Sequence, residues 1–317
     1  MKIVVLDGYT VNPGDISWEE ISGQGDFVCY DRTAPEDVVE RAADAEIILT
    51  NKVVIGREEI DRLPRLQYIG VMATGYNVVD YRYAREKGIT VTNVPAYSTA
   101  SVAQMAFAHL LHVVNDVAHY ASENRNGRWC TSPDFSYQDA PQRELAQMTI
   151  GIFGLGDIGS RVAGIAEAFG MTVLAVTSKP QEALPEYVRK VTWDEMLAES
   201  DVITLHCPLA DDTFEMIDAA TLARMRTGCI LMNMSRGPLI NEQAVADALA
   251  DGMLGAYCAD VLSLEPPRAD NPLLTAPRCC LTPHIAWATV EARQRLLQIC
   301  AQNICKFVRK SPQNVIN

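Results

Sequence analysis

Short apolar runs alternate with segments of helical periodicity along the whole chain, a pattern that favours an α/β fold with mainly parallel sheets. In the first third, segments 34–43 and 57–63 have helical character and separate the expected strands. Strands joined in this way form a small doubly wound unit. The strands expected there are Ile3 to Leu6, Phe27 to Tyr30, Glu46 to Thr50, Tyr68 to Met72 and Thr90 to Asn93.

A long helix is predicted over residues 101–122, where apolar side chains recur at helical spacing. A second α/β unit is predicted after an irregular stretch. Within this unit Thr192 and Glu195 form a capping box that opens one helix, and Asn241 caps another. The last helix is expected over 290–308. The strands of this unit are expected at Thr149 to Phe153, Thr172 to Val176, Val202 to His206, Cys229 to Met232, Ala256 to Asp260 and Cys280 to Thr282.

Length and composition limit the class of protein. A chain of 317 residues suggests roughly two domains, and a hydrophobic content of 48% permits a large core without disulfides. The formal net charge of −13 argues against nucleic acids and anionic membranes as partners. A small anionic substrate would then need a local positive group, which draws attention to Arg236.

Cysteine usage and the missing targeting signals indicate a reduced compartment. The nine cysteines include no C-x-x-C pair, and several lie in strand-like text, so buried reduced thiols are expected. No carboxylate or thiol completes a ligand set with the helical histidines His109, His112 and His119, so no metal is predicted. The chain opens on a strand and has no apolar run that would span a bilayer, so a cytoplasmic protein is expected.

A glycine-rich turn, Gly154-Leu155-Gly156-Asp157-Ile158-Gly159, lies between an expected strand and an expected helix. In that context the spacing predicts dinucleotide binding, whereas a plain strand-to-helix turn would not need three glycines. Gly154 would permit the tight turn, and Gly156 would let the backbone approach the pyrophosphate. Gly159 would let the helix and the strand pack closely.

The segment after the second strand of this unit bears on the choice between NADH and NADPH. It reads Thr177, Ser178 and Lys179, without the acid that usually binds the adenosine ribose. The two hydroxyls can hydrogen-bond a 2′-phosphate and Lys179 can neutralise it, which favours NADPH. The alternative is a neutral loop that accepts either cofactor. His206, at the end of an expected strand, either lines the cofactor groove or is a buried neutral histidine.

Three stretches further along the chain carry the residues that reduction of a 2-keto acid requires. Arg236 follows an expected strand, and its guanidinium can fork onto carboxylate and keto oxygens. His284 follows another expected strand and can deliver a proton to the oxygen that becomes negative when hydride adds to the substrate. Glu265 would hydrogen-bond the other ring nitrogen and keep the imidazole charged. The combination of Arg236, Glu265 and His284 favours catalytic roles over the alternatives, which are a surface arginine and a structural histidine.

The chain resembles the D-isomer-specific 2-hydroxyacid dehydrogenase family over essentially its whole length. A narrower similarity to glycerate dehydrogenases, also called hydroxypyruvate reductases, lies in the first and last of the matching stretches. Those stretches are Ala73-Thr74-Gly75-Tyr76-Asn77-Val78-Val79-Asp80, Val102-Ala103-Gln104, the glycine turn, Asn233-Met234-Ser235-Arg236-Gly237, Asp260-Val261 and His284-Ile285-Ala286-Trp287-Ala288.

The resemblance implies a division into domains. A Rossmann NAD(P)-binding domain would comprise 100–289, and a smaller flavodoxin-like substrate domain would comprise 1–99 together with 290–317. The predicted helix over 101–122 would embrace a second subunit, giving a homodimer.

The resemblance also implies roles for single residues. Ala73, Thr74 and Gly75 would present backbone amides to the substrate carboxylate, and Trp287 would shape the substrate pocket. Asp260 would hold the nicotinamide carboxamide. The other residues implied to line the cofactor are Val102, Asp157, Ile158, His206 and Met234.

The activity implied is NAD(P)-dependent reduction of hydroxypyruvate to D-glycerate, with glyoxylate as a second substrate. A D-lactate-like dehydrogenase is an alternative, whereas formate dehydrogenases pair their histidine with glutamine, so Glu265 argues against that activity. A hypothesis of another class is a non-enzymatic NAD(H)-sensing protein, because the C-terminal-binding-protein corepressors resemble this family. Nucleotide-dependent capture of a peptide partner, without turnover of any keto acid, would favour that hypothesis.

Overall fold

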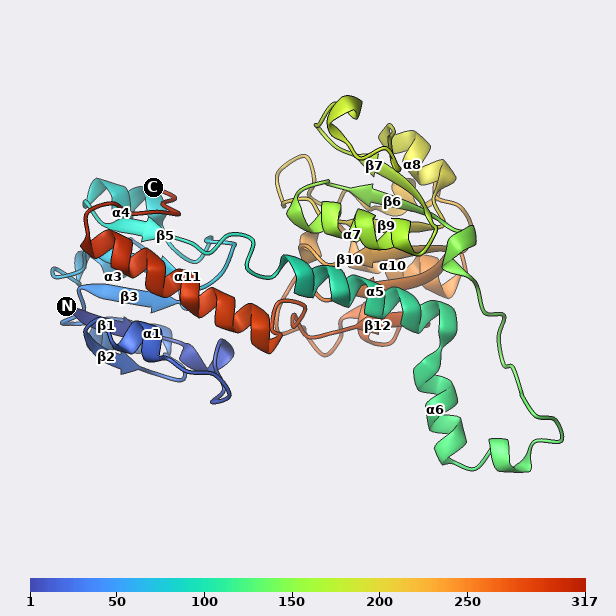
Figure 1. Cartoon of the computed structure of the whole chain (residues 1–317), viewed down its shortest axis with the longest axis horizontal. Helices are drawn as coiled ribbons and strands as arrows, with labels where there is room; N and C mark the ends of the chain where they lie inside the picture. Colours follow the sequence, from blue (N-terminus) through green and yellow to red (C-terminus); the bar gives the residue numbers. More distant parts are fainter. The chain divides into compact units, whose positions relative to one another are not determined.

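The computed structural model describes residues 1–317, which divide into two compact units (Figure 1). The first unit comprises Met1–Ser98 and Trp287–Asn317, and the second comprises Thr99–Ala286. Each unit is built on one parallel sheet, so the predicted fold class is confirmed. The functional assignment of the two units stays a prediction.

The first unit has a five-stranded sheet in the order β2-β1-β3-β4-β5, which is the flavodoxin-like order. One face packs beneath α1 and α11, and the other packs beneath α2, α3 and α4. The strands are β1 Lys2–Val5, β2 Asp26–Cys29, β3 Ile47–Thr50, β4 Tyr68–Val71 and β5 Thr90–Thr92, and the helices are α1 Glu19–Ser22, α2 Val38–Arg41, α3 Arg57–Asp61, α4 Tyr81–Glu86 and α11 Val290–Val308.

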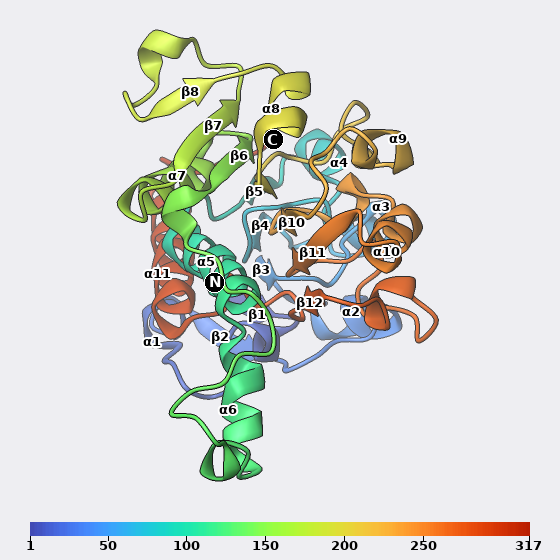
Figure 2. The ribbon, with the colours of Figure 1, turned by 90° about the vertical axis from the view of Figure 1, so that its right-hand side faces the viewer.

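The second unit has a seven-stranded sheet in the order β12-β11-β10-β9-β6-β7-β8 (Figure 2). Numbered from β6, this is the Rossmann order 3-2-1-4-5-6 with a seventh strand at one edge. The strands are β6 Thr149–Phe153, β7 Thr172–Val176, β8 Val188–Lys190, β9 Val202–Leu205, β10 Cys229–Asn233, β11 Leu254–Ala259 and β12 Cys279–Leu281. The helices are α5 Thr99–Asn115, α6 Val117–Arg125, α7 Asp157–Ala168, α8 Trp193–Glu199, α9 Ala219–Leu222 and α10 Glu242–Ala250.

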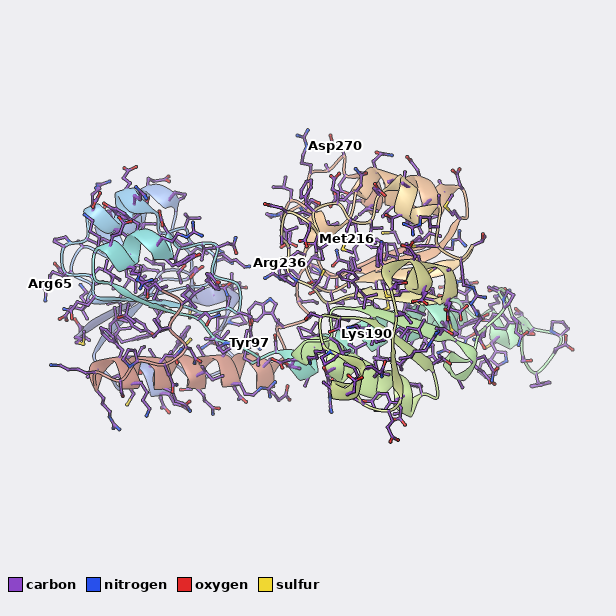
Figure 3. The ribbon with its side chains drawn as sticks, turned by 90° about the horizontal axis from the view of Figure 1, so that it is seen from above. Arg65, Tyr97, Lys190, Met216, Arg236 and Asp270 are labelled. Carbon is purple, nitrogen blue, oxygen red and sulfur yellow. The ribbon has the colours of Figure 1, made fainter.

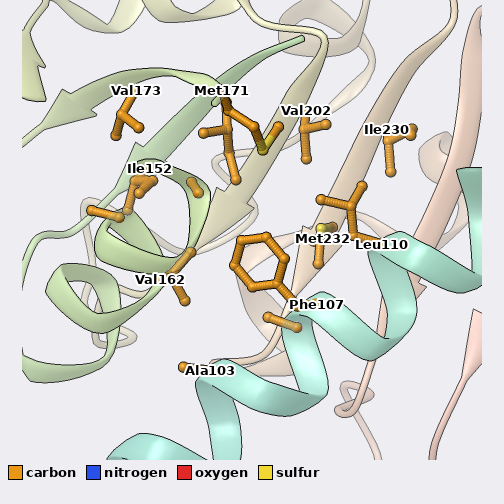
Figure 4. Packing of buried hydrophobic residues seen from close by; sticks show 14 of the residues in the cluster. Ala103, Phe107, Leu110, Ile152, Val162, Met171, Val173, Val202, Ile230 and Met232 are labelled. Atoms are coloured by element: carbon orange, nitrogen blue, oxygen red, sulfur yellow. The ribbon is translucent and has the colours of Figure 1, made fainter. Parts of the chain in front are cut away.

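Helix α5 covers one face of this sheet because its apolar residues share one side of the helix. Phe107 and Leu110 point toward Ile152 of β6 and Met232 of β10 in a dry cluster (Figure 4). The Phe107 ring stacks on Phe169 with ring centroids 5.5 Å apart. The opposite face of the sheet packs against α8 and α10. Both faces are therefore buried, which explains the continuous apolar strands in the sequence.

The prediction of one helix over 101–122 is wrong, because α5 ends at Asn115 and α6 begins at Val117. Between them Asp116 has a φ of 47°, in the left-handed region. Asp and Asn enter this region more readily than most residues because their short polar side chains bond locally. The apolar repeat continues through the break and so does not reveal it. Helix α6 buries no side chain and extends away from the sheet of its unit (Figure 1).

The predicted helix caps are confirmed. The Thr192 hydroxyl accepts the Glu195 amide at 3.3 Å, while the Glu195 carboxylate accepts the Thr192 amide at 2.7 Å. The Asn241 side chain accepts the amide of Ala244 at 3.0 Å. Strand β8 was not predicted, because it is three residues long and two of them are exposed and charged.

Candidate active site

The three predicted catalytic residues follow three neighbouring strands of the second unit. Arg236 comes after β10, Glu265 after β11 and His284 after β12, so all three lie beyond the carboxyl edge of one sheet. Ligands bind at this edge in open parallel sheets, because the loops there leave a crevice. The order of the strands therefore brings together residues that are far apart in the sequence.

Glu265 and His284 form a direct pair. The Nδ1 of His284 lies 2.6 Å from Oε2 of Glu265, and both side chains are about one-third exposed. The second carboxylate oxygen of Glu265 accepts the amide of Leu262 at 2.9 Å, which fixes the carboxylate plane. His284 has a φ of 53°, an uncommon value that occurs more often at functional sites. The pairing fixes the orientation of the imidazole, so that Nε2 points away from Glu265.

Asp260 holds the segment that carries His284. Its buried carboxylate accepts the hydroxyl of Thr282 at 2.5 Å and the amides of Ile285 and Ala286 at 2.9 and 2.7 Å. Three hydrogen bonds to one carboxylate leave the loop around His284 little freedom. Sequence reasoning had noted Asp260 only through the resemblance and had missed this anchoring contact.

The Arg236 loop is held by a buried asparagine that the sequence reasoning did not single out. The side chain of Asn233 donates to the Arg236 carbonyl at 2.8 Å and accepts the Ser235 amide at 3.0 Å. The Ser235 hydroxyl donates to the carbonyl of Cys207 at 2.5 Å. The guanidinium itself reaches the surface of the second unit (Figure 3). A buried polar residue at the end of an apolar strand is the signal that would have identified Asn233.

Gly237 couples the Arg236 loop to the Glu265 loop by close backbone packing. A Cβ at this position would lie 2.0 Å from the carbonyl carbon of Leu262 and 2.3 Å from the amide nitrogen of Ser263. These are backbone atoms, so the loops must separate to admit any side chain.

We expect Gly237→Ala to lower the free energy of unfolding by about 1–3 kcal/mol, the usual cost of overpacking a tight contact. It should also reduce turnover, because both loops shift. Chemical denaturation and initial rates measure the two effects. The matched control is Gly164→Ala, whose Cβ would make only an ordinary contact with Tyr187 and whose helical site favours alanine. Equal stability of the two variants would contradict the packing argument.

The glycine turn has the form needed to approach a dinucleotide. Gly154 has a φ of 94°, and its Cβ would lie 2.7 Å from the carbonyl oxygen of His206. At Gly159 a Cβ would lie 2.1 Å from the carbonyl oxygen of Gly154, so the strand and α7 can pack only around glycine. A Cβ at Gly156 would meet nothing within 4 Å. Gly156 therefore borders open space at the N-terminus of α7, where backbone amides favour phosphate.

His206 adds a second feature to the same groove. Its Nε2 pairs with the Thr204 hydroxyl at 2.9 Å, whereas Nδ1 is buried without a hydrogen-bond partner. Burial lowers the pKa of His206 to about 4, so the ring is neutral near pH 7. The unsatisfied Nδ1 and the open space at Gly156 both fit a bound dinucleotide.

The segment after β7 places a positive charge beside the glycine turn. The ammonium of Lys179 donates to the carbonyl of Leu155 at 2.7 Å, and its backbone amide donates to the Thr177 hydroxyl at 3.2 Å. Lys190 donates to the Lys179 carbonyl at 2.7 Å. Ser178 is exposed next to them. Val102 and Met234 are almost fully buried in the cluster beneath α5, and Asp157 and Ile158 form the first turn of α7.

The remaining predicted substrate residues belong to the first unit. Ala73, Thr74 and Gly75 form a loop after β4, where Thr74 donates its hydroxyl to the Val94 carbonyl at 3.0 Å. The Trp287 ring meets Tyr97 edge to face with ring centroids 6.3 Å apart.

No group of three or more His, Cys, Asp or Glu side chains is arranged to hold a metal ion. No helix combines the length and the apolar character needed to cross a membrane.

Comparison with known proteins agrees with this geometry. Residues 107–286 match the model of the NAD-binding domain of D-isomer-specific 2-hydroxyacid dehydrogenases. The chain is 46% identical to a hydroxypyruvate reductase of Blautia hydrogenotrophica, with 100% of both chains covered. It is 39% identical to a glycerate dehydrogenase of Methylorubrum extorquens, with 99% of this chain and 98% of the relative covered.

A solved structure has the same fold. An acyclic imino acid reductase in complex with NADPH and D-Arg superposes with a TM-score of 0.85 at 30% identity, covering 100% of both chains. The chain belongs to the D-isomer-specific 2-hydroxyacid dehydrogenase family. It is an NAD(P)-dependent oxidoreductase acting on D-2-hydroxy acids, and the predictions of family and enzyme class are confirmed.

Proposed function

We propose that the protein reduces hydroxypyruvate to D-glycerate and accepts glyoxylate as a second substrate. The observation that carries this proposal is the Glu265–His284 pair, held at the same sheet edge as Arg236. Similarity to a hydroxypyruvate reductase and a glycerate dehydrogenase over whole chains supports the choice of substrate. Rates with a panel of 2-keto acids test it.

The catalytic roles follow from the chemistry of the three side chains. Arg236 binds the carboxylate and the keto oxygen of the substrate, because a planar guanidinium donates two parallel hydrogen bonds. A bound nicotinamide supplies hydride to C2. His284 gives the proton on Nε2 to the C2 oxygen as negative charge develops there. Glu265 holds the imidazole through Nδ1 and balances its charge, as in the orienting pair of a catalytic triad.

The first unit supplies the rest of the substrate site in this proposal. Backbone amides of Ala73, Thr74 and Gly75 bind the carboxylate, and Trp287 limits the size of the substrate. The first unit is thus the substrate domain and the second is the cofactor domain.

The glycine turn at the carboxyl edge of the second sheet would hold the cofactor. Gly154, Gly156 and Gly159 shape the turn, and Asp157 and Ile158 in the first turn of α7 would hold the pyrophosphate. A carboxylate offers roughly four lone-pair sites, and Asp260 uses three of them within the protein, so one acceptor site is left for the nicotinamide carboxamide. Val102, His206 and Met234 complete the lining.

NADPH is the preferred cofactor in this proposal. Thr177 and Ser178 offer hydroxyls, and Lys179 offers a charge, to a 2′-phosphate. Structural neighbours have been solved with either cofactor, an acyclic imino acid reductase with NADPH and a D-lactate dehydrogenase with NAD, so the preference rests on Thr177, Ser178 and Lys179.

We expect Lys179→Met to raise the KM for NADPH about twofold to fivefold while the KM for NADH changes little. The reason is that one exposed charge pair is worth up to about 1 kcal/mol. Steady-state kinetics with both cofactors measure the ratio, and NADH serves as the internal control. An equal change with NADH and NADPH would show that Lys179 does not contact a 2′-phosphate.

A homodimer completes the proposal. Helix α6 buries no side chain, and beyond it Trp129 and Phe135 are 55% and 91% exposed. Large apolar groups exposed together commonly mark an interaction surface. A second copy covering α6 and this segment removes them from water. Light scattering should give twice the chain mass of 34.9 kDa, and a single-chain mass at micromolar concentration would contradict the dimer.

A further inference from the structure

Two pairs of polar side chains lie next to each other, one across β11 and β12 and one just beyond the carboxyl ends of these strands. Cys258 of β11 is opposite Cys280 of β12 in the parallel register. Two residues further on, the Thr282 hydroxyl donates to the Asp260 carboxylate at 2.5 Å. Residues two apart in a strand point to the same face of a sheet, so the thiol pair and the Thr282–Asp260 pair share one face. That face is the one covered by α5.

Helix α5 supplies one histidine to each pair. His112 lies close enough to Cys280 to lower the pKa of its thiol, and His109 Nε2 lies 3.1 Å from the Thr282 hydroxyl. The two histidines are three positions apart and therefore lie one helical turn from each other on the same side. The Cys258 thiol donates to the His109 carbonyl at 4.0 Å, so polar contacts link the thiol pair through His109 to the loop that carries His284.

The two thiols differ in acidity. The adjacent Cys258 thiol lowers the pKa of Cys280, and the nearby His112 imidazole lowers it further. The adjacent Cys280 thiol, together with burial, raises the pKa of Cys258 well above its usual value. Cys280 also borders a cavity of about 480 Å³ between α5 and β12, lined by Met105, Ala108, His109, His112 and Thr282 among others.

We propose that Cys258 and Cys280 form an oxidisable thiol pair that peroxides convert into a disulfide between β11 and β12. Neighbouring strands lie about 4.8 Å apart, which is within the Cα separations that disulfides span, roughly 4.4–6.8 Å. The cavity admits hydrogen peroxide to Cys280, while Cys258 is buried directly behind it. The attacking thiol is therefore reachable and the resolving thiol is already in place.

The chemistry balances with peroxide as the oxidant. The Cys280 thiolate attacks one peroxide oxygen, the O–O bond breaks, and a sulfenic acid and hydroxide result. The Cys258 sulfur then attacks the sulfenic sulfur, the S–O bond breaks, and water leaves with the Cys258 proton. In sum, two thiols are oxidised to a disulfide and hydrogen peroxide is reduced to two water molecules.

Oxidation should slow turnover because the bond forms two residues before Asp260 and Thr282, whose contact anchors the His284 loop. A disulfide draws the strand ends together and changes the spacing that this contact and the His109 contact require. This effect on turnover rests on the proposed function, whereas formation of the disulfide does not.

Peptide mapping after peroxide treatment tests the pair without any assay of activity. The intact protein is treated with hydrogen peroxide, its remaining thiols are alkylated under denaturing conditions, and it is digested with trypsin without reductant. Cys258 is the only cysteine in the tryptic peptide 237–268, and Cys280 lies in the peptide 279–293. We expect a disulfide to link these two peptides and dithiothreitol to remove it. The link should form at least about tenfold faster than the exposed Cys130 is oxidised.

The neighbouring Cys279 provides a matched control. It also borders the cavity, but it packs against the hydrophobic cluster on the opposite face of the sheet, and burial raises its pKa to about 12. The linked peptide should persist in Cys279→Ala and vanish in Cys280→Ala, or in Cys280→Ser if the alanine variant unfolds. A link that depends on Cys279, or Cys280 oxidising no faster than Cys130, would overturn the proposal.

Turnover measured on the same samples tests the consequence. We expect the peroxide-treated protein to lose at least about fivefold in rate, to regain it with dithiothreitol, and to keep its rate under peroxide when Cys280 is replaced. A quantitatively linked protein with unchanged turnover would refute control of the His284 loop. If no keto acid is turned over before oxidation, the proposed function fails, and the peptide map still decides whether the disulfide forms.

Discussion

Replacement of His284 by asparagine should lower turnover by about 10²- to 10⁴-fold, the usual worth of a general acid. Asparagine tolerates the left-handed backbone at this position, where φ is 53°, but its amide is far too weak an acid to transfer a proton. The variant therefore separates chemistry from backbone strain, which alanine would not do. Substrate binding should change little, because Arg236 is untouched. Single-turnover rates with excess enzyme measure the chemical step directly.

A second histidine in the chain gives a matched control. His119 Nε2 lies 2.6 Å from an Asp139 oxygen, the same separation and degree of exposure as in the Glu265–His284 pair. His119→Asn should leave the chemical step almost unchanged, because a surface pair contributes at most about 1 kcal/mol. Glu265→Gln should give an intermediate loss, because it keeps an acceptor for Nδ1 but removes the charge. Similar losses at His119 and His284 would contradict the proposed proton transfer.

Arg236→Ala should lower kcat/KM by about 10²- to 10⁴-fold, mostly through binding of the substrate. The guanidinium makes two charge-assisted hydrogen bonds to the keto acid in our proposal, each worth about 1.5–3 kcal/mol. The protein carries a net charge of −13, so the loss of the local positive group also weakens attraction of an anion. Steady-state kinetics over a range of substrate concentrations separate the effect on KM from that on kcat.

Arg236→Lys is the informative companion to that variant. It keeps the charge and loses the planar fork, so we expect it to recover only a small part of the lost rate. Full recovery would show that Arg236 acts as a point charge and does not orient the substrate. Neither change should alter stability much, because the side chain is exposed and its bonded partner is its own neighbour, the Ser235 carbonyl.

The sequence predicted those strands, turns, helices and caps that are determined by residues close together in the chain. The strand, glycine turn and helix around Gly154 follow from alternation of apolar runs with glycines, and α11 was predicted with its observed bounds. Thr192 and Asn241 were recognised as caps because the capping contact spans three residues. Each of these features is decided within a few residues of sequence.

The features that were missed depend on contacts between distant segments. The break at Asp116 lies inside an unbroken apolar repeat, so periodicity could not reveal it. The close packing of Gly237 on Leu262 exists only because β10 and β11 are neighbours. Cys258 and Cys280 are far apart in the sequence and become partners only through the pairing of β11 with β12.

The candidate catalytic residues were predicted only in part, because their types and positions are local features but the contacts that hold their loops are not. Arg236 and His284 were predicted from residue type and their position after strands, and the structure shows them at one sheet edge. The anchoring of their loops by Asn233 and Asp260 was not predicted, because a buried carboxylate or amide finds its partners in the folded loop.

The central claim is most directly tested by following nicotinamide absorbance with the purified protein, NADPH or NADH, and hydroxypyruvate, glyoxylate or pyruvate in parallel. We predict oxidation of the cofactor with the highest kcat/KM for hydroxypyruvate, and a faster reaction with NADPH than with NADH. Higher kcat/KM with pyruvate would indicate a D-lactate dehydrogenase. Nucleotide binding without oxidation by any 2-keto acid would contradict the proposed reaction.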